Sequence, residues 1–246
     1  MNALTLVTYN IHKGLSPLNR HGTMHGLAHA LDKLAPDLLC LQEVQGAHRR
    51  HTRRHGEVMP QADFLAKALE HEPHYGPHAV YRMGHHGNAI LARWPWACCQ
   101  THDLTLHRLE QRGLVHGTLT PPDWPLPLHI ISCHLNLLER HRQRQLQHLV
   151  EYIEREIPAN DAVILAGDFN DWRRKAGPQL ADIGLIDAHL ALHGQPAKTF
   201  PARHPLLALD RIYLRRLTVN QACAVNTPPF PHLSDHLPLL LRFTPP

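Results

Sequence analysis

The stretch Leu165-Ala166-Gly167-Asp168-Phe169-Asn170-Asp171 closes an apolar run and decides how the rest of the chain is interpreted. The run before it predicts a buried strand, and Asp168 and Asn170 stand two residues apart at its end. If the extended geometry persists to Asn170, these two side chains point the same way, one an anion and one a neutral hydrogen-bonding group. Far downstream, Ser234-Asp235-His236 adds a titratable imidazole. The combination predicts metal-assisted phosphate chemistry.

The composition favours one globular unit. The chain has 246 residues, 43% of them hydrophobic and 19% charged, which suffices for a sizeable core. No repeat, low-complexity stretch or linker divides it, so we expect a single domain over residues 1–246. Its apolar runs fall short of the roughly 20 residues that span a bilayer, and Met1 to Val7 resemble a first strand rather than a secretion signal. We expect a cytoplasmic monomer without a transmembrane segment.

The cysteines and the charges restrict the chemistry further. The five cysteines are odd in number, and Cys40 and Cys133 lie in apolar runs, which predicts buried thiols rather than a disulfide framework or a zinc site. The formal charge of +4 leaves out 24 histidines and favours anionic partners. The densest basic stretch, His48 to His55, could follow a nucleic-acid backbone, lie against anionic lipid headgroups, or be an ordinary solvated loop.

Hydrophobic periodicity predicts strands throughout the chain with helices between them. Helical segments are predicted over 24–34, 62–70, 140–157 and 182–193. Strands are predicted over 4–9, 37–44, 78–81, 88–93, 97–106, 113–119, 126–133, 162–167, 210–214, 218–225 and 237–243. The second of these ends in Gln42-Glu43, so Glu43 is a carboxylate delivered by a buried strand. A fold of two sheets packed face to face, with helices on the outside, would contain such a set of strands and helices.

Seven short segments follow one another along nearly the whole chain. They are Thr8-Tyr9-Asn10-Ile11, Leu41-Gln42-Glu43-Val44, Gly87-Asn88-Ala89-Ile90-Leu91, His134-Leu135-Asn136, Gly167-Asp168-Phe169-Asn170, Leu209-Asp210-Arg211-Ile212 and Ser234-Asp235-His236-Leu237-Pro238. In content and order they resemble the endonuclease/exonuclease/phosphatase (DNase I-like) superfamily, in a bacterial-type form. Each segment alone is weak, but seven in the family's order are not a chance match.

The resemblance implies an α/β fold, a four-layer α/β sandwich in which two packed mixed or antiparallel β-sheets carry helices on their outer faces. It also implies a Mg²⁺ ion, with Mn²⁺ as a possible substitute, held mainly by Glu43 with Asn10 assisting. Asp235 is the other candidate ligand, direct or through water. A hard cation takes oxygen ligands and keeps several waters, so few acids suffice. His12 stands where some members carry an acidic residue, which argues against a second tight metal site.

The same match implies roles for the catalytic candidates. Asp168 and Asn170 would orient the attacking water and bind the phosphate, while His236, held by Asp210, would contact a phosphate oxygen or act as an acid or base. A carboxylate behind an imidazole raises its pKa, which suits a protonated His236 with Asp168 as base. The mirror assignment, with His236 as base, stays open. His134 would donate to the scissile phosphate.

Three further residues are candidate substrate contacts: Asn136 beside His134, Arg211 on the approach to Asp210, and Trp172 near the cleft. Most of the other aromatic side chains are expected in the core. The alternative interpretation of the acids and amides is turn capping, and that of most histidines is ordinary packing or solvation. The joint order of the motifs outweighs both.

The sequence therefore predicts a Mg²⁺-dependent hydrolase of phosphate esters, a phosphodiesterase that works by in-line attack of water. Nucleic acid is slightly favoured as substrate, because Arg49 to Arg54 with Arg140, Arg142 and Arg144 could supply a basic groove. A lipid or small-molecule phosphodiesterase or phosphatase is the alternative, and it needs only a local basic rim and an apolar lip. A non-catalytic binding protein on the same fold is the distant alternative, but it would have lost acidic or histidine positions that this chain keeps.

Overall fold

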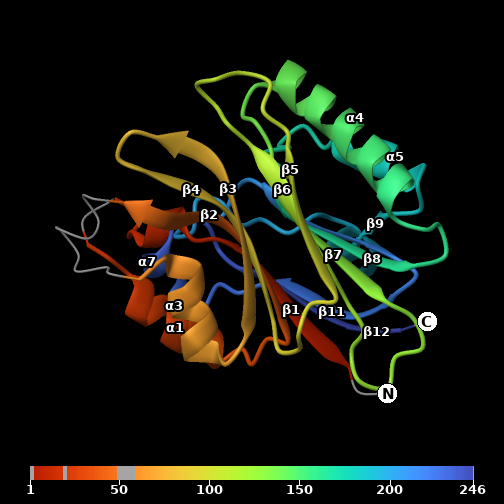
Figure 1. The fold of residues 1–246 in the computed structure, drawn as a ribbon, viewed down its shortest axis with the longest axis horizontal. Helices are drawn as coiled ribbons and strands as arrows, with labels where there is room; N and C mark the ends of the chain where they lie inside the picture. Colours follow the sequence, from red (N-terminus) through yellow and green to blue (C-terminus); the bar gives the residue numbers. More distant parts are fainter. Residues whose placement is uncertain (1–2, 19–20, 49–58, 246) are drawn as a thin grey trace.

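Two six-stranded sheets organise the chain in the computed structural model, which describes residues 3–18, 21–48 and 59–245 (Figure 1). The first sheet has the strand order β11-β12-β1-β2-β4-β3. Its strands are β1 (Leu4–Asn10), β2 (Leu38–His48), β3 (Glu72–Tyr81), β4 (Gly84–Ala92), β11 (Thr218–Ala224) and β12 (Leu239–Thr244). β1 pairs with β2 in parallel, and the remaining pairs of this sheet are antiparallel.

The second sheet has the order β5-β6-β7-β8-β10-β9. Its strands are β5 (Cys98–Asp103), β6 (Gly113–Leu119), β7 (Leu128–His134), β8 (Ala162–Asp168), β9 (Ile186–Asp187) and β10 (Asp210–Arg215). β7 and β8 are parallel, whereas the other pairs are antiparallel. The strands predicted between 78 and 133 are thus divided between the two sheets, with β3 and β4 in the first and β5, β6 and β7 in the second.

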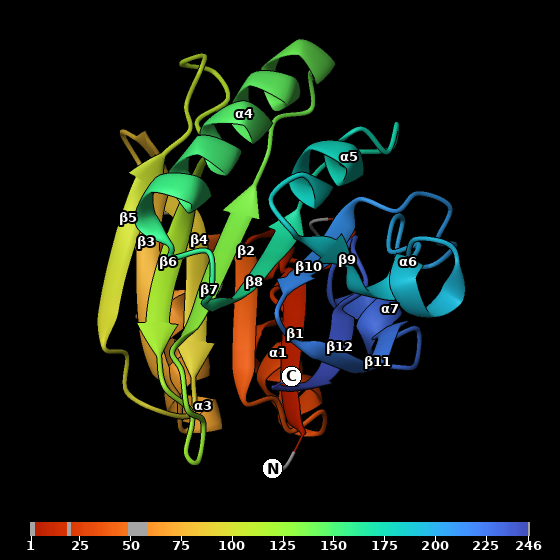
Figure 2. The same cartoon turned by 90° about the vertical axis from the view of Figure 1, so that its right-hand side faces the viewer.

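Helices cover the outer faces of both sheets, which confirms the four-layer sandwich (Figures 1 and 2). The helices α1 (Met24–Asp32), α3 (Gln61–Leu69) and α7 (Phe230–Leu233) pack on the first sheet, and α4 (Glu139–Glu156) and α5 (Ala176–Ala181) pack on the second. The short helix α6 (Ala188–His193) lies against β10 and β11. Three clusters of buried apolar side chains result, one between the sheets and one under each helical layer.

The predicted helix over 182–193 is wrong in its first half. Asp182 is the C-cap of α5, and Gly184 follows with a left-handed φ of 78°. The chain then enters β9, where Asp187 caps α6 by accepting hydrogen bonds from the backbone N–H groups of His189 and Leu190. The apolar spacing that suggested one helix is therefore divided by a turn whose geometry glycine permits.

Two expectations about the interior can be compared with the structure. Cys40 and Cys133 are free, buried thiols as predicted. Within the described ranges, no helix combines the length and the apolar character that crossing a bilayer requires.

The strand ends bring distant segments together at one end of the two sheets. Asn10 ends β1, His134 ends β7 and Asp168 ends β8. Because β7 and β8 run parallel, His134 and Asp168 lie at the same edge of the second sheet. Asp210 begins β10, which runs antiparallel to β8, so that Asp210 and Asp168 are register partners. Functional groups from four strands therefore converge at the carboxyl ends of β1, β7 and β8.

Candidate active site

Asp168 lies at the centre of the converging side chains. Its Oδ2 atom accepts a hydrogen bond from Nδ2 of Asn10 at 3.1 Å and lies 3.4 Å from Nε2 of His134 and 3.8 Å from Nε2 of His236. Its Oδ1 atom accepts from the backbone N–H of Asn170 at 3.0 Å. The carboxyl group is nearly inaccessible, since Asp168 is 2% exposed. The structure thus places four predicted site residues directly around the fifth.

His236 is held from behind by Asp210. The Nδ1 atom of His236 lies 2.8 Å from Oδ2 of Asp210, and Thr199 donates its hydroxyl hydrogen to the same oxygen at 2.5 Å. Because an ionised carboxylate only accepts hydrogen bonds, Nδ1 carries a proton. The ring of Phe200 packs 5.0 Å from the imidazole, centroid to centroid. These contacts fix the imidazole with its Nε2 edge toward Asp168.

Burial and neighbouring charges set the ionisation of His236, Asp168 and His134. Burial alone would lower the pKa of His236, but the carboxylates of Asp210 and Asp168 outweigh it and raise that pKa well above its usual value. Burial also raises the pKa of Asp168, an effect that His236 partly offsets and Asp210 reinforces. At His134, burial together with the nearby Arg112 lowers the pKa well below its usual value. A carboxylate therefore lies between one charged and one neutral imidazole.

Gly167 explains how His134 and Asp168 come so close. Its φ is 144°, and a Cβ atom at this position would lie 2.0 Å from the carbonyl oxygen of Cys133. Only glycine permits this approach of β8 to β7. One residue later, the backbone N–H of Leu135 donates to the carbonyl oxygen of Asp168 at 2.9 Å, which continues the contact between the two strands beyond their ends.

A β-bulge presents Glu43. In the pairing of β2 with β4, Leu41 faces Ala89 and Val44 faces Gly87, so two residues of β2 oppose one of β4. Glu43 has a left-handed φ of 54° in this bulge. A bulge redirects a side chain and is common beside active sites. Here it turns the carboxylate of Glu43 toward Lys13, whose Nζ atom lies 2.7 Å from Oε2.

The charge of Glu43 is stabilised by its cationic neighbour Lys13. Burial would raise its pKa, but the ammonium group of Lys13, which also donates a hydrogen bond to it, holds that pKa well below the usual range of a glutamate. Glu43 is thus an anion at neutral pH. Lys13 was not among the residues predicted for the site, although it lies only three residues after the predicted metal ligand Asn10.

The 3₁₀ turn η1 (His12–Gly14) joins Glu43 to the third predicted metal ligand, Asp235. While Lys13 contacts Glu43, the adjacent His12 places Nδ1 at 3.3 Å from Oδ1 of Asp235. The hydroxyl of Ser234 donates to the backbone carbonyl of Asn10 at 2.7 Å and so ties this loop to the end of β1. Asn10, Glu43 and Asp235 are therefore connected through one short turn.

Two sets of residues could hold a metal ion. The first combines Asp168, Asp210 and His236, whose ligand atoms lie within 4.8 Å of one another. A protonated imidazole is not a metal ligand, and His236 already uses Nδ1 for Asp210, so this set suits proton transfer better. The second set is the predicted one, Asn10, Glu43 and Asp235, which offers the oxygen donors that Mg²⁺ and Mn²⁺ prefer; Lys13 lies at Glu43 and His12 at Asp235.

A cleft of about 950 Å³ opens above Glu43. Its charged lining contains four cations and two acids: Lys13, Arg108, Arg112, Arg140, Glu43 and Glu110. A small neighbouring pocket shares Glu43 and Arg112 with the cleft and is also lined by His134, whose Nε2 atom contacts Asp168. An anionic substrate entering the cleft would meet Glu43, one of the three predicted metal ligands, together with the cationic side chains of the lining.

The three predicted substrate contacts lie in different surroundings. Asn136 is buried and faces α4, where its Oδ1 accepts from Nε2 of Gln145 at 2.8 Å. Arg211 pairs with Asp187 at 3.0 Å and is 4% exposed, so the structure does not bring it to Asp168. Trp172 is half-exposed, and its ring lies 4.5 Å from the guanidinium carbon of Arg142.

The predicted basic groove is only partly supported. Arg142 is 1% exposed, donating to the backbone carbonyls of Asn136 and Leu137 and pairing with Glu139. It stabilises the turn after His134 and does not face solvent. Arg140 and Arg144 are exposed, and Arg140 lines the cleft. The segment from Arg49 to Arg54 lies outside the described residues.

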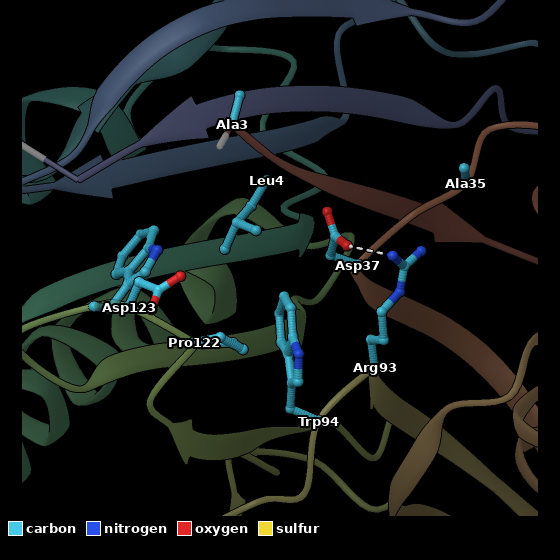
Figure 3. Close-up of a pocket in the computed structure, with 9 residues that line it drawn as sticks. Ala3, Leu4, Ala35, Asp37, Arg93, Trp94, Pro122 and Asp123 are labelled. Atoms are coloured by element: carbon cyan, nitrogen blue, oxygen red, sulfur yellow. Dashed lines mark ion pairs between the residues drawn. The ribbon is translucent and has the colours of Figure 1, made fainter. Parts of the chain in front are cut away.

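A second hollow, of about 400 Å³, lies at the start of β1, the end opposite Asn10 (Figure 3). Arg93 pairs there with Asp37 at 3.2 Å, and the ring of Trp94 stands beside Pro122. Its lining contains none of the predicted site residues. The candidate site is therefore the cleft over Glu43 and not this hollow.

Comparisons with known proteins place these observations in context. The sequence model of the Endonuclease/Exonuclease/phosphatase family matches residues 7–236. The chain is 41% identical over 238 residues to the uncharacterized protein YbhP of Escherichia coli K12, covering 95% of this chain and 93% of that protein.

Solved structures share the fold at lower identity. A structure of TDP2 from D. rerio with a single-strand DNA product has a TM-score of 0.74 at 20% identity and covers 99% of this chain and 100% of its own. A mannosyl-6-phosphatase from Bacteroides thetaiotaomicron has a TM-score of 0.76 at 16% identity, covering 98% of this chain and 99% of its own. These likenesses concern the fold alone.

Proposed function

The chain belongs to the endonuclease/exonuclease/phosphatase family, and from this premise we propose that it is a Mg²⁺-dependent phosphodiesterase. The observation that carries the proposal is the buried group of His134, Asp168, Asp210 and His236, in which His134 shares a small pocket with Glu43, and Glu43 lines a cleft with mainly cationic charge. A family described by endonucleases, exonucleases and phosphatases acts on phosphate esters. The chain keeps every acidic and histidine residue that this chemistry requires.

In the proposed site, Asn10, Glu43 and Asp235 would hold Mg²⁺, with Mn²⁺ as a substitute, because their oxygen atoms suit a hard cation. When bound, the ion would neutralise negative charge that develops on the phosphate oxygens. The ammonium group of Lys13 beside Glu43 contributes a second, permanent positive charge at the same place. Lys13 therefore offsets the negative charge of Glu43, which would otherwise repel an anionic substrate.

Asp168 is the proposed base. Its raised pKa makes it a better proton acceptor than an ordinary surface aspartate, and Asn10 and Asn170 fix both of its oxygens. A water molecule held by Asp168 and the amide of Asn170 would lose its proton to the carboxylate as it attacks phosphorus. The incoming oxygen would be in line with the leaving group.

His236 is the proposed acid. Its Nε2 atom is 3.8 Å from Asp168, too far for a hydrogen bond, so this N–H is available to a substrate oxygen. Asp210 keeps the imidazole protonated and oriented. His134, which burial keeps neutral, would donate to a non-bridging phosphate oxygen. These assignments follow the raised pKa of His236 and disfavour the mirror scheme in which it is the base.

The substrate class is the finer part of the proposal. A nucleic acid is one candidate, supported by the formal charge of +4 and by the likeness to a TDP2 structure that contains a single-strand DNA product. A lipid or small-molecule phosphate ester is the other, and the apolar side chains around the cleft favour it. A non-catalytic role on this fold is the least supported, because the complete proton-transfer group would then have no use. We also propose that residues 1–246 form one domain.

The proposal is tested by hydrolysis of bis-p-nitrophenyl phosphate in Mg²⁺, in Mn²⁺ and in EDTA. We expect metal-dependent turnover that is lost in Glu43→Ala, Asp168→Ala and His236→Ala and retained in Asp182→Ala, which removes an exposed carboxylate at the end of α5. Turnover that persists in EDTA or in Asp168→Ala would overturn the mechanism. If neither this diester, p-nitrophenyl phosphate, a single-stranded oligonucleotide nor a phospholipid is cleaved, the non-catalytic alternative holds.

A further inference from the structure

Large apolar side chains surround the mouth of the candidate active-site cleft. Five exposed ones line it, and we call them the apolar rim: Val80, Tyr81, Leu109, Leu137 and Leu138. Leu109 is the most exposed of them, with 90% of its surface accessible. Single exposed apolar residues are common on soluble proteins, but a contiguous group beside a cleft marks a surface that binds something.

Three separate segments build the rim. Val80 and Tyr81 end β3 at the turn into β4, Leu109 lies in the loop from β5 to β6, and Leu137 and Leu138 precede α4. Figure 1 shows the β3–β4 turn and the β5–β6 loop projecting from the same end of the sandwich. No local periodicity demands apolar residues in such turns, where polar residues are usual. Their convergence therefore indicates a surface feature and not part of the core.

Cationic side chains accompany the rim. Arg108 and Arg140 line the same cleft, each beside a rim residue in the sequence, and neither has a carboxylate partner among the residues that the structure describes. Of the two acids in the lining, Glu110 is engaged by Arg112 at 3.3 Å and by the backbone N–H of Leu137 at 2.8 Å. The surface thus combines exposed apolar groups with positive charge that is not neutralised locally.

The chemistry of the rim distinguishes between two anionic partners. Single-stranded nucleic acid binds through aromatic platforms on which bases stack, yet four of the five rim residues are aliphatic. Trp172, the exposed tryptophan near this end of α4, is stacked on Arg142 instead. Aliphatic side chains flanked by arginines are typical of surfaces that enter the interfacial region of a bilayer with anionic headgroups.

We propose that the apolar rim, with Arg108 and Arg140, docks this protein on the surface of an anionic lipid bilayer. In this orientation the cleft faces the phosphodiester group of a lipid. The docking is independent of catalysis, whereas the identity of the substrate rests on the proposed phosphodiesterase function. In this arrangement the leucines contact acyl chains, the arginines contact headgroup phosphates, and Glu43 lies in the lining of the same cleft.

Docking is measured first, without turnover. The full chain carrying Asp168→Asn is sedimented in EDTA with sucrose-loaded vesicles of phosphatidylcholine alone or with 30% phosphatidylglycerol as a probe. We expect binding to the anionic vesicles, roughly tenfold weaker when Leu109→Ser and Leu138→Ser are added. Replacing Arg108 and Arg140 by Gln weakens it by about fivefold per cation. Ile186→Ser with Leu190→Ser, at exposed apolar positions outside the cleft, leaves binding unchanged.

Three results would overturn the docking inference. One is a lack of binding to anionic vesicles by protein whose thermal unfolding is normal. Another is equal loss of binding in the control pair and in the rim pair. The third is binding of a single-stranded oligonucleotide that depends on the same rim residues and is not displaced by vesicles. The wild-type chain is assayed separately for metal-dependent cleavage of bis-p-nitrophenyl phosphate, so that failure of catalysis and failure of docking are distinguished.

Discussion

Nδ1 of His236 and Oδ2 of Asp210 lie 2.8 Å apart, although the two residues come from different segments of the chain, and this contact keeps the imidazole protonated and oriented. We expect Asp210→Asn to lower kcat by about a hundredfold or more, the usual contribution of a positioned proton-transfer group. The variant should bind substrate nearly as well as the wild type does, because Asp210 does not reach the cleft. Steady-state kinetics with a soluble phosphodiester measures both quantities.

The chain offers a matched control for this substitution. On the outer face of the second sheet, Nε2 of His129 lies 3.1 Å from Oδ2 of Asp161. Asp161→Asn alters a histidine–aspartate contact of similar length away from the cleft, and kcat should not change. Equal losses of kcat in the two variants would mean that general destabilisation, and not proton transfer, explains the effect of Asp210→Asn.

The pH dependence of kcat/KM should separate the two acid–base schemes. With Asp168 as base and His236 as acid, activity rises as pH passes the raised pKa of Asp168, above the value of about 4 for an ordinary aspartate. It then stays high beyond pH of about 6.5, because His236 with its raised pKa retains its proton there. Activity that rises only in alkaline solution, as His236 loses its proton, would instead support His236 as base.

Lys13 would compete with a metal ion bound at Glu43. Because its ammonium group lies 2.7 Å from Oε2, a divalent cation at Glu43 is opposed by a charge of the same sign. We expect Lys13→Met to tighten binding of Mn²⁺ by about tenfold, or ~1.4 kcal/mol, while KM for the phosphodiester rises. Titration calorimetry with Mn²⁺ measures the affinity without turnover. Lys67→Met, on the exposed side of α3, is the control, and weaker Mn²⁺ binding in Lys13→Met would refute the competition.

Arg142 and Arg144 form a natural comparison for stability. Arg142 is buried and satisfies the carbonyls of Asn136 and Leu137, whereas Arg144 is exposed two residues later on the same helix. Arg142→Met leaves these buried carbonyls without donors and should lower the free energy of unfolding by about 2–3 kcal/mol. Arg144→Met should change it by less than about 0.5 kcal/mol. Urea denaturation checks both values, and equal effects would mean that the buried contacts contribute nothing.

Acid should destabilise the fold through its buried histidines. Burial, with the neighbouring His129, lowers the pKa of His116 to about 4, whereas the unfolded value is about 6.5. Between these values the unfolded state binds more protons, so stability falls as pH falls, by up to about 1.4 kcal/mol per pH unit for this group. In His116→Gln the slope of the unfolding free energy against pH should be smaller. An unchanged slope would assign the acid sensitivity to other groups.

The sequence by itself determined the strands and which residues stand at their ends. Apolar runs such as Val163 to Leu165 predict buried strands from neighbouring residues alone, and the polar residue after each run is consequently known. Asn10 and Asp168 could be identified in this way, whereas Glu43 lies within β2 at a bulge and Asp210 begins its strand; the order of the motifs added the expected fold. The helix predicted over 182–187 was wrong because Gly184 makes a turn there, and a turn can fall between apolar residues that still have helical spacing in the sequence.

Only the tertiary structure decided which side chains meet. The bulge at Glu43 depends on its pairing with β4, the contact of Asp210 with His236 depends on two loops, and the burial of Arg142 depends on the turn that it stabilises. The apolar rim likewise joins three segments that are far apart in sequence. Local patterns report which face of an element is apolar, whereas such contacts arise from long-range packing, which no short stretch of sequence encodes.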